Sequence, residues 1–427
     1  MNITREAIKG VKWTTVSSVI HATTGLLKVS ILARFLEKSD FGLMAIIMFV
    51  LGFMNLFMDM GISTAILHKQ DISKKQYASL YWANVVFSVL LFGAIFLIAK
   101  PVAEFYNEPE LIVLLPIMGS SLILSAIGRQ YRTIEEKNLN FRYIAIVTIA
   151  SYLISLLLAI ILAVNGFGIY SMVLGVLSQH VVSNCTFLIS GIRKMGLLFH
   201  FAFAEIKDLL RIGLYHVGGQ MINYFNRDLD ILLVGKFFGS ETLGGYSLAK
   251  ELVFRPTKIV NPILTRVASP ILSKIQNNLG ELRMNYLKLI NAVASINIPI
   301  YLILIVTAPI VVRILFGEGF DDIFNLVRIL SVYMMFRTIG NPVIAVIIAT
   351  GRTDLNFIWS TVTLVVMPIA VVIGSQFSID AVAICLTIAI ALLFIPNWWF
   401  LIYKTIGVKL STYVYWIIPG VMFFQKR

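Results

Sequence analysis

Charged residues are scarce in this sequence: Asp, Glu, Lys and Arg together make up 13% of its 427 residues. Soluble domains carry about 25%. Hydrophobic residues reach 58%, and so little charge cannot give a chain of this composition a wettable surface. The composition therefore excludes an ordinary soluble protein and favours one that is embedded in lipid.

Cysteine and recognisable catalytic motifs are also scarce. The two cysteines, Cys185 and Cys385, lie inside apolar runs, where they are typical of small core residues rather than of ligands or a disulfide. The sequence contains no Walker-type phosphate loop, no HExxH and no GxSxG motif. We therefore predict no enzymatic chemistry and no cofactor, and we take transport as the default function.

Apolar runs of about 20 residues recur along the chain, and about 20 helical residues span the ~30 Å hydrocarbon core of a bilayer. We predict an all-α membrane protein with about twelve spanning helices. The predicted spans cover residues 11–34, 41–66, 80–99, 109–128, 143–164, 167–191, 213–236, 244–269, 288–312, 323–350, 356–375 and 379–401. A further run, 413–424, is too short to cross and predicts a partial thirteenth helix.

The predicted organisation has two six-helix lobes, residues 1–195 and 213–401, with a cytoplasmic linker at 196–212 and a short tail at 402–427. With the N-terminus in the cytoplasm, the cytoplasmic connections hold about 20 Lys and Arg and the opposite side about 5. Cytoplasmic loops retain positive charge, so we predict a cytoplasmic N-terminus. The same bias explains most of the net charge of +13, and it predicts contact with membrane lipids and none with nucleic acid.

The two halves resemble each other at a shift of about 202 residues. Ala33-Arg34-Phe35-Leu36 then falls on Gly235-Lys236-Phe237-Phe238, and Phe41-Gly42 falls on Leu243-Gly244. Six predicted helices, an even number, precede the second copy. The pattern therefore predicts parallel repeats about an axis along the membrane normal, with a cleft between them.

Several charged residues lie deep inside predicted spans. At about 3 kcal/mol each, six lipid-facing cations would cost roughly 18 kcal/mol, more than the typical stability of about 5 to 15 kcal/mol, so they must face a polar interior. These cations are Lys28, Arg227, Lys250, Arg255, Lys258 and Arg337. Polar residues at helical spacing accompany them on the same faces, namely His21, Gln220 and Asn223.

The deep carboxylates are fewer than the deep cations, and they are Asp59, Asp228, Asp230 and Glu251. A cavity with surplus positive charge favours an anionic substrate, such as a phosphate, a pyrophosphate or an acidic sugar, and repels a cationic drug. Simpler interpretations remain open. Asp228 and Asp230 can merely neutralise Arg227 or Lys28, Glu251 and Arg255 can form a packed i,i+4 pair, and Asp59 can be a satisfied buried group.

Short motifs in the first 70 residues resemble the N-terminal pattern of Wzx-type polysaccharide and O-antigen flippases, in the multidrug/oligosaccharidyl-lipid/polysaccharide exporter superfamily. They are Gly10-Val11-Lys12-Trp13, Ile31-Leu32-Ala33-Arg34-Phe35-Leu36, Ser39-Asp40-Phe41-Gly42 and Asp59-Met60-Gly61. The basic stretch from Arg129 to Arg142, with Ala349-Thr350-Gly351-Arg352, is similar to the colanic and teichuronic acid exporter branch.

This resemblance implies a MATE-like fold of two six-helix lobes around a central cavity, in the bacterial cytoplasmic membrane. It implies that an undecaprenyl-diphosphate-linked oligosaccharide passes from the inner to the outer leaflet by alternating access. Polysaccharide polymerases or glycosyltransferases are the implied protein partners. Family members usually have fourteen helices, with the last pair docking lipid, and this chain stops about one and a half helices short.

In our first hypothesis the six cations, with His21, Gln220 and Asn223, bind the substrate. Asp228, Asp230, Glu251 and Asp59 serve ion coupling or gating, with a proton or sodium gradient as the drive. The alternatives are an ion-coupled drug antiporter on the same fold and a flippase for the peptidoglycan lipid precursor. A polysaccharide polymerase or ligase would need a large external loop, and a structural scaffold would not retain costly intramembrane charges.

Overall fold

The computed structural model describes residues 3–58, 62–69 and 71–421, and this part of the chain contains helices and turns but no strand. A bilayer offers the backbone no hydrogen-bond partners, and a helix satisfies its backbone groups internally. The helices are α1 (Ile3–Leu32), α2 (Lys38–Met58), α3 (Ile62–His68), α4 (Lys74–Tyr106), α5 (Leu111–Lys137), α6 (Phe141–Val164), α7 (Ile169–Met195), α8 (Phe203–Lys274), α9 (Leu279–Phe316), η1 (Asp321–Ile323), α10 (Phe324–Gly340), α11 (Val343–Thr350), α12 (Thr353–Ser375), α13 (Ile379–Asn397), η2 (Trp398–Tyr403), α14 (Lys404–Ile406) and α15 (Leu410–Ile417).

Ten segments of the described chain are long and apolar enough to cross a membrane, and they match ten of the twelve predicted spans. The other two predicted spans, 213–236 and 244–269, lie in the charged helix α8. Large apolar side chains point outward on many of these helices, as with Leu97 at 78% exposed and Val306 at 77%. Lipid covers such surfaces, so the prediction of an all-α, multi-pass membrane protein is confirmed.

The chain forms two compact units. The first contains residues 1–224 with 239–244 and 315–317, and the second contains 225–238, 245–314 and 318–427. Helix α8 therefore contributes to both units. It begins at Phe203, inside the stretch 196–212 that we predicted to be a linker. The limits of the two predicted six-helix lobes stay predictions.

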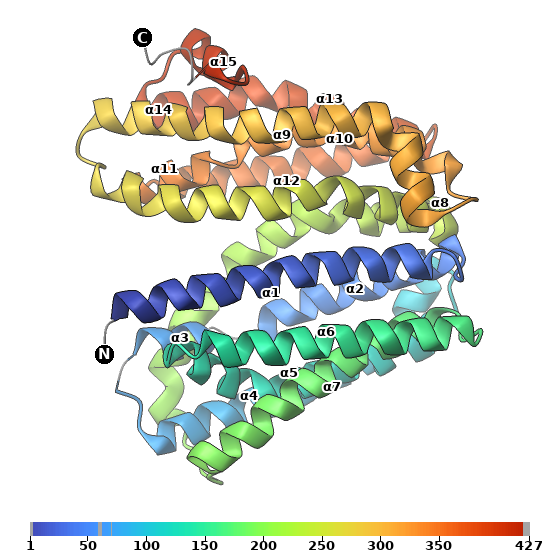
Figure 1. Cartoon of the computed structure of the whole chain (residues 1–427), viewed down its shortest axis with the longest axis vertical. Helices are drawn as coiled ribbons and strands as arrows, with labels where there is room; N and C mark the ends of the chain where they lie inside the picture. Colours follow the sequence, from blue (N-terminus) through green and yellow to red (C-terminus); the bar gives the residue numbers. More distant parts are fainter. Residues whose placement is uncertain (1–2, 59–61, 70, 422–427) are drawn as a thin grey trace. The chain divides into compact units, whose positions relative to one another are not determined.

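In the first unit α4 packs against α5, α6 against α7 and α1 against α6 (Figure 1). A buried cluster that includes Leu80, Tyr131 and Phe187 fills the space between α4, α5 and α7. Glu135, near the end of α5, is bound by Lys194 at the end of α7, and it accepts a hydrogen bond from Asn140 at 2.6 Å. The ion pair joins the ends of α5 and α7, and the hydrogen bond from Asn140 holds the turn between α5 and α6.

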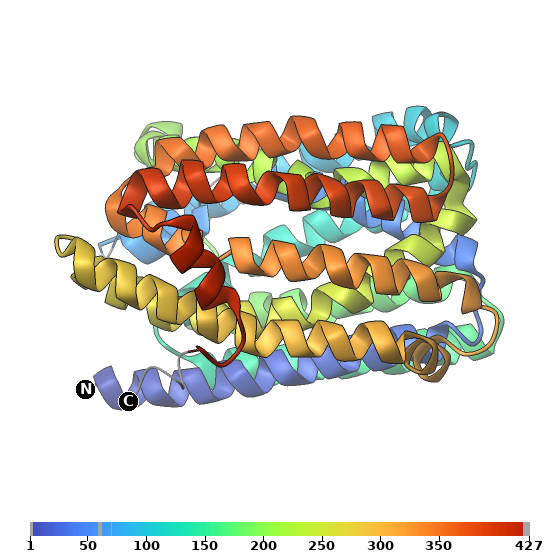
Figure 2. The same cartoon turned by 90° about the horizontal axis from the view of Figure 1, so that it is seen from above.

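In the second unit α12 and α13, orange to red in Figure 2, run side by side, and α13 also packs against α10. The short helix α15, only 8 residues long, joins a core cluster that includes Tyr286, Tyr413 and Trp416. Asn291 of α9 holds its end by donating to the carbonyl oxygens of Trp416 at 2.9 Å and Ile418 at 2.8 Å. This short helix overlaps residues 413–417 of the run 413–424 for which we predicted a partial helix.

Helix α8 is one continuous element only by hydrogen bonding, because Gly239 interrupts it with φ 79° and ψ 179°. Positive φ is readily adopted by glycine and costs other residues steric strain. The interruption separates a first limb, 203–238, from a second limb, 240–274. These limbs carry most of the charged residues that the sequence places inside spans.

The first unit contains a close crossing between the start of α2 and the start of the second limb of α8. A Cβ atom added to Gly42 would lie 1.8 Å from the carbonyl oxygen of Ser240, and one added to Gly244 would lie 1.8 Å from that of Lys38. Residue 244 follows residue 42, and residue 240 follows residue 38, at the same shift of about 202 residues. The crossing is thus reciprocal in the register that the repeat predicts.

We expect Gly42→Ala and Gly244→Ala each to destabilise the protein by about 1 to 3 kcal/mol or more, because a methyl group there meets backbone that cannot rotate away. The measurement is thermal or denaturant unfolding in detergent. Gly93→Ala is the matched control, since Gly93 also lies inside a helix but a Cβ there meets nothing within 4 Å. Equal stability of all three variants would contradict the close crossing.

Candidate functional site

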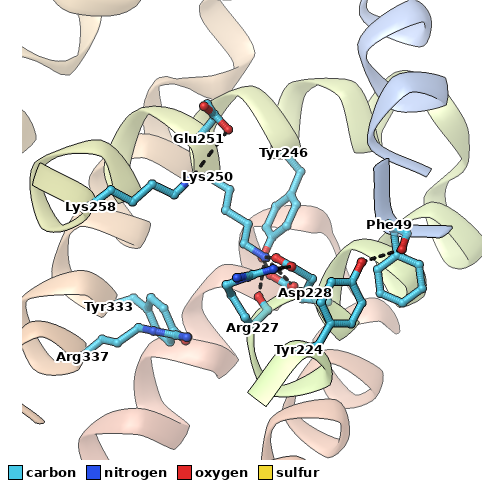
Figure 3. A network of polar contacts seen from close by, with 11 residues as sticks. Phe49, Tyr224, Arg227, Asp228, Tyr246, Lys250, Glu251, Lys258, Tyr333 and Arg337 are labelled. Atoms are coloured by element: carbon cyan, nitrogen blue, oxygen red, sulfur yellow. Dashed lines mark hydrogen bonds and ion pairs between the residues drawn. The ribbon is translucent and has the colours of Figure 1, made fainter. Parts of the chain in front are cut away.

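Lys250, on the second limb of α8, is the centre of a buried ion-pair network in the second unit (Figure 3). Its side chain is 9% exposed, and its Nζ lies 2.7 Å from Asp230 Oδ1 and 3.4 Å from Asp228 Oδ1. Nζ also donates to the carbonyl oxygen of Arg227 at 2.7 Å. All three acceptors lie on the first limb of α8, so this ammonium group ties the two limbs together on either side of Gly239.

The two carboxylates differ in their other partners. Asp230 accepts a hydrogen bond on Oδ2 from the Tyr246 hydroxyl at 2.6 Å, so both of its oxygens are bound. Asp228 receives the guanidinium of Arg227, with Nη2 and Nε each 2.7 Å from Oδ2. The Arg227 side chain is 53% exposed and can therefore release Asp228 at lower cost than the buried Lys250.

Arg337 of α10 joins the network through an aromatic ring. Its guanidinium carbon lies 5.3 Å from the centre of the Phe254 ring, and Lys250 Nζ lies 5.5 Å from the same centre. Arg337 also donates to the Tyr333 hydroxyl at 2.5 Å. The ring face attracts both cations and partly offsets the repulsion between them.

The network carries more positive than negative charge. Three cations, Arg227, Lys250 and Arg337, stand against the two carboxylates Asp228 and Asp230, both of which act electrostatically on Arg337. Asp228 and Asp230 are 17% and 15% exposed, so water screens them weakly. With both carboxylates ionised the network has a net charge of +1, which favours an additional anion.

A small cavity of about 20 Å³ adjoins Arg227, Asp230, Tyr333 and Arg337. One water molecule needs roughly 10 to 15 Å³ of such volume, so the space admits about one water and no larger group. Asn226 also lines it, and among the described residues the buried Asn226 Oδ1 has no hydrogen-bond partner. In this conformation Arg227 and Lys250 are paired with carboxylates, and the space beside Arg337 is too small for an anion larger than a water molecule. A larger anion therefore enters only if the network rearranges.

Glu251, Arg255 and Lys258 form a second charged group on α8, which begins directly after Lys250 and extends about two turns further along the helix. Arg255 Nη2 lies 2.9 Å from Glu251 Oε1. Lys258 Nζ lies 3.9 Å from Glu251 Oε2, a contact that Figure 3 shows. Glu251 is 45% and Lys258 is 57% exposed. Glu251 and Arg255 thus form the i,i+4 ion pair considered in the sequence analysis, and this group is more exposed than the Lys250 network. The roles of these residues in the site stay predictions.

The other predicted site residues belong to the first unit or cannot be located. Lys28 Nζ lies 3.1 Å from the Ser155 hydroxyl, without a carboxylate partner in the part of the chain that the structure describes. His21 stacks on Tyr152 with ring centres 4.2 Å apart. Gln220 and Asn223 are exposed and lie outside the network, and Asp59 lies outside the described residues.

The simpler interpretation of Asp228 and Asp230 is partly right: they do neutralise cations, but Lys250 and Arg227 rather than Lys28. Sequence reasoning missed Tyr246, Phe254 and Tyr333. Helical spacing contains the signal, because Tyr246 and Phe254 lie four residues before and after Lys250, and Tyr333 lies four before Arg337. An aromatic residue at such a spacing from a buried cation is a candidate partner for it.

We expect Lys250→Met to destabilise the protein by about 3 to 5 kcal/mol, because it leaves two weakly screened carboxylates without their buried partner. The measurement is denaturant unfolding in detergent. The double variant Lys250→Met with Asp230→Asn should recover much of the loss, since the uncompensated charge is removed. Lys258→Met is the control and should cost less than about 1 kcal/mol, because that pair is exposed. A small effect of Lys250→Met would contradict the central role of this ion pair.

Comparison with known proteins identifies relatives along most of the chain. Residues 31–325 match the family model of polysaccharide biosynthesis proteins. The lipopolysaccharide biosynthesis protein WzxC of Escherichia coli strain K12 is 30% identical over 380 residues, 88% of this chain and 77% of WzxC. The teichuronic acid biosynthesis protein TuaB of Bacillus subtilis strain 168 is 28% identical over 416 residues, 96% of this chain and 85% of TuaB.

Two solved structures share the fold. The lipid II flippase MurJ, in an inward closed conformation, has a TM-score of 0.79 at 15% identity, covering 96% of this chain and 91% of MurJ. An inward-facing multidrug resistance transporter of the MATE family has a TM-score of 0.70 at 14% identity, covering 88% of this chain and 93% of the transporter. The predicted MATE-like fold is confirmed by these similarities.

The relatives also confirm the predicted resemblance, since they are named for polysaccharide biosynthesis. One of them, ExoT of Rhizobium meliloti strain 1021, is 24% identical over 86% of this chain and is named as a transport protein. The matched region covers well over half of the sequence and contains the two limbs of α8 with their ion pairs. The chain belongs to the family of polysaccharide biosynthesis proteins.

Proposed function

We propose that this protein moves an undecaprenyl-diphosphate-linked oligosaccharide repeat unit across the bacterial cytoplasmic membrane by alternating access, for cell-surface polysaccharide biosynthesis. The observation that carries this proposal is the buried network with surplus positive charge around Lys250, within a polysaccharide biosynthesis protein. A diphosphate offers several anionic oxygens, and guanidinium and ammonium groups are the side chains that bind them best.

Arg227 and Arg337 are the residues of this network that we expect to bind the diphosphate first. Arg227 is half exposed, and its guanidinium can exchange Asp228 for a phosphate oxygen without leaving a buried charge alone. Arg337 has an aromatic ring and a hydroxyl as partners, and no carboxylate of the described residues lies within ion-pair distance of it. Arg255, Lys258 and Lys28 remain predicted contacts for acidic sugars, and the name of the relative TuaB refers to an acidic polymer.

The orientation proposed from the Lys and Arg count places the N-terminus in the cytoplasm. The substrate then enters from the inner leaflet and leaves towards the outer leaflet. Polysaccharide polymerases or glycosyltransferases remain the expected protein partners.

A proton or sodium gradient is the proposed drive, and Asp228 and Asp230 are the proposed coupling groups. Each carboxylate lies on the first limb of α8 and pairs with Lys250 on the second limb. An ion that binds to a carboxylate would therefore free a cation for the substrate. We expect Asp230→Asn to make transport insensitive to an imposed gradient. The measurement compares transport rates in vesicles with and without a proton or sodium gradient, and a gradient response equal to that of the unmodified protein would contradict this role.

A flippase for the peptidoglycan lipid precursor is the second candidate, favoured by the fold similarity to MurJ. Both substrates carry a lipid diphosphate, so the cation network suits either one. A drug antiporter is less favoured, because surplus positive charge repels cationic drugs.

Reconstituted vesicles test the proposed function. Arg227→Gln and Arg337→Gln should each lower the translocation rate of lipid-linked oligosaccharide at least about tenfold, because each removes a charge-assisted contact worth roughly 1.5 to 3 kcal/mol. Arg227→Lys keeps the charge and should retain part of the rate. Lys100→Gln is a control on the exposed end of α4, where the side chain is 75% exposed.

Two results would contradict the proposal: full activity of both Gln variants, and transport of peptidoglycan precursor with none of oligosaccharide. A third result concerns the second charged group alone. Full activity after Arg255→Ala together with Lys258→Ala would remove that group from the predicted substrate contacts.

A further inference from the structure

A second polar cavity lies wholly within the first unit, between α1, α5 and α6. Its volume of about 230 Å³ is more than ten times what one water molecule needs. Helices α1 and α6 pack side by side along its length (Figure 1). The ion-pair network around Lys250 belongs to the other unit, so this cavity is a separate feature.

Three hydroxyl groups in this cavity are available to a ligand. Ser17 and Ser18 of α1 and Thr148 of α6 line it, and within the described residues their hydroxyls have no hydrogen-bond partner. Ser17 and Thr148 are half-buried and Ser18 is exposed, so their hydroxyls are accessible from the cavity. Each hydroxyl offers one donor and two acceptor lone pairs to a polar occupant.

An aromatic wall stands beside these hydroxyls. His21 and Tyr152 stack with ring centres 4.2 Å apart and an angle of 32° between the planes, and the Tyr152 hydroxyl bonds to Gln179. Flat rings next to a few well-placed polar groups are typical of sites that bind small organic molecules. The C–H face of a sugar ring can pack on such a wall while its hydroxyls reach the serine and threonine side chains.

The charge of the cavity is balanced, unlike that of the Lys250 network. Arg132 and Glu136 line it together and form an ion pair of 3.2 Å. One guanidinium and one carboxylate cancel in net charge, yet they offer several donors and acceptors. This combination favours a neutral polyol over a phosphate, which would require surplus positive charge, and over a metal ion, which would require several carboxylates.

We propose that this cavity binds sugar residues of the lipid-linked oligosaccharide, while its diphosphate binds elsewhere. The inference rests on the proposed function. Arg132 and Glu136 lie at the end of α5 that the Lys and Arg count places in the cytoplasm, so the cavity opens on the side where the substrate enters. The saccharide and the diphosphate then have separate determinants on one chain.

Binding to two ligands tests the assignment. The purified protein is titrated in detergent with undecaprenyl diphosphate, which has no sugar, and with lipid-linked oligosaccharide extracted from membranes of the producing cells. The variant Ser17→Ala, Ser18→Ala, Thr148→Val should raise the Kd for the oligosaccharide about tenfold and leave the Kd for undecaprenyl diphosphate unchanged, because only hydroxyl contacts are lost. Arg227→Gln should weaken both ligands.

Two controls separate binding from folding. Thr186→Val removes a threonine hydroxyl from α7 in the same unit, where it bonds to the carbonyl oxygen of Val182 and does not line the cavity; it should change neither Kd. Thr148→Val alone, which preserves side-chain shape, should raise the Kd for the oligosaccharide by a few fold with an unchanged unfolding temperature.

An unchanged Kd for the oligosaccharide in the triple variant would overturn the saccharide site and leave the proposed function standing. Equal weakening of both ligands would overturn it as well, because the hydroxyls would then act on the shared lipid diphosphate or on the fold. An unmodified protein that binds neither ligand would instead overturn the proposed function.

Discussion

A charged group inside a lipid-embedded helix bundle is stable only when the protein itself supplies what water would have supplied. Lys250 meets this requirement with two carboxylates and a backbone carbonyl, and the whole arrangement depends on bringing both limbs of α8 together across Gly239. The burial of the Lys250 ammonium group therefore depends on the turn that the positive φ of Gly239 makes possible. Without the turn, the carboxylates of the first limb would not reach the lysine of the second.

Much of the fold follows from composition and periodicity, because lipid imposes a simple rule on every spanning segment. Ten of the predicted spans appear as long apolar helices, and even the short helix near residue 413 has its counterpart in α15. The start of α8 at Phe203 was not expected, since the exposed aromatic stretch before it has no clear helical signal. The break between the predicted spans 213–236 and 244–269 does appear in the structure, because Gly239 interrupts α8 within that gap.

The candidate site was predicted less completely. The cost of burial singled out Lys250, Arg227 and Arg337, because that cost depends on residue type and depth alone. Which carboxylate meets which cation depends on how the two limbs approach each other. The sequence suggested Arg227 or Lys28 as partners of Asp228 and Asp230, and it did not identify Lys250 as the partner of Asp230. The tyrosines were missed for a similar reason: a hydroxyl that completes an ion pair looks like any other aromatic residue until the pair is located.

The crossing of α2 and α8 at Gly42 and Gly244 has a consequence for how the two repeats can vary. Each glycine faces a backbone carbonyl of the other segment, not a side chain. A smaller side chain at the opposing position would not make room for a larger residue. Neither glycine can therefore be replaced with the help of a second, compensating substitution. The opposing positions themselves are free to differ, and they already do, with lysine at 38 and serine at 240.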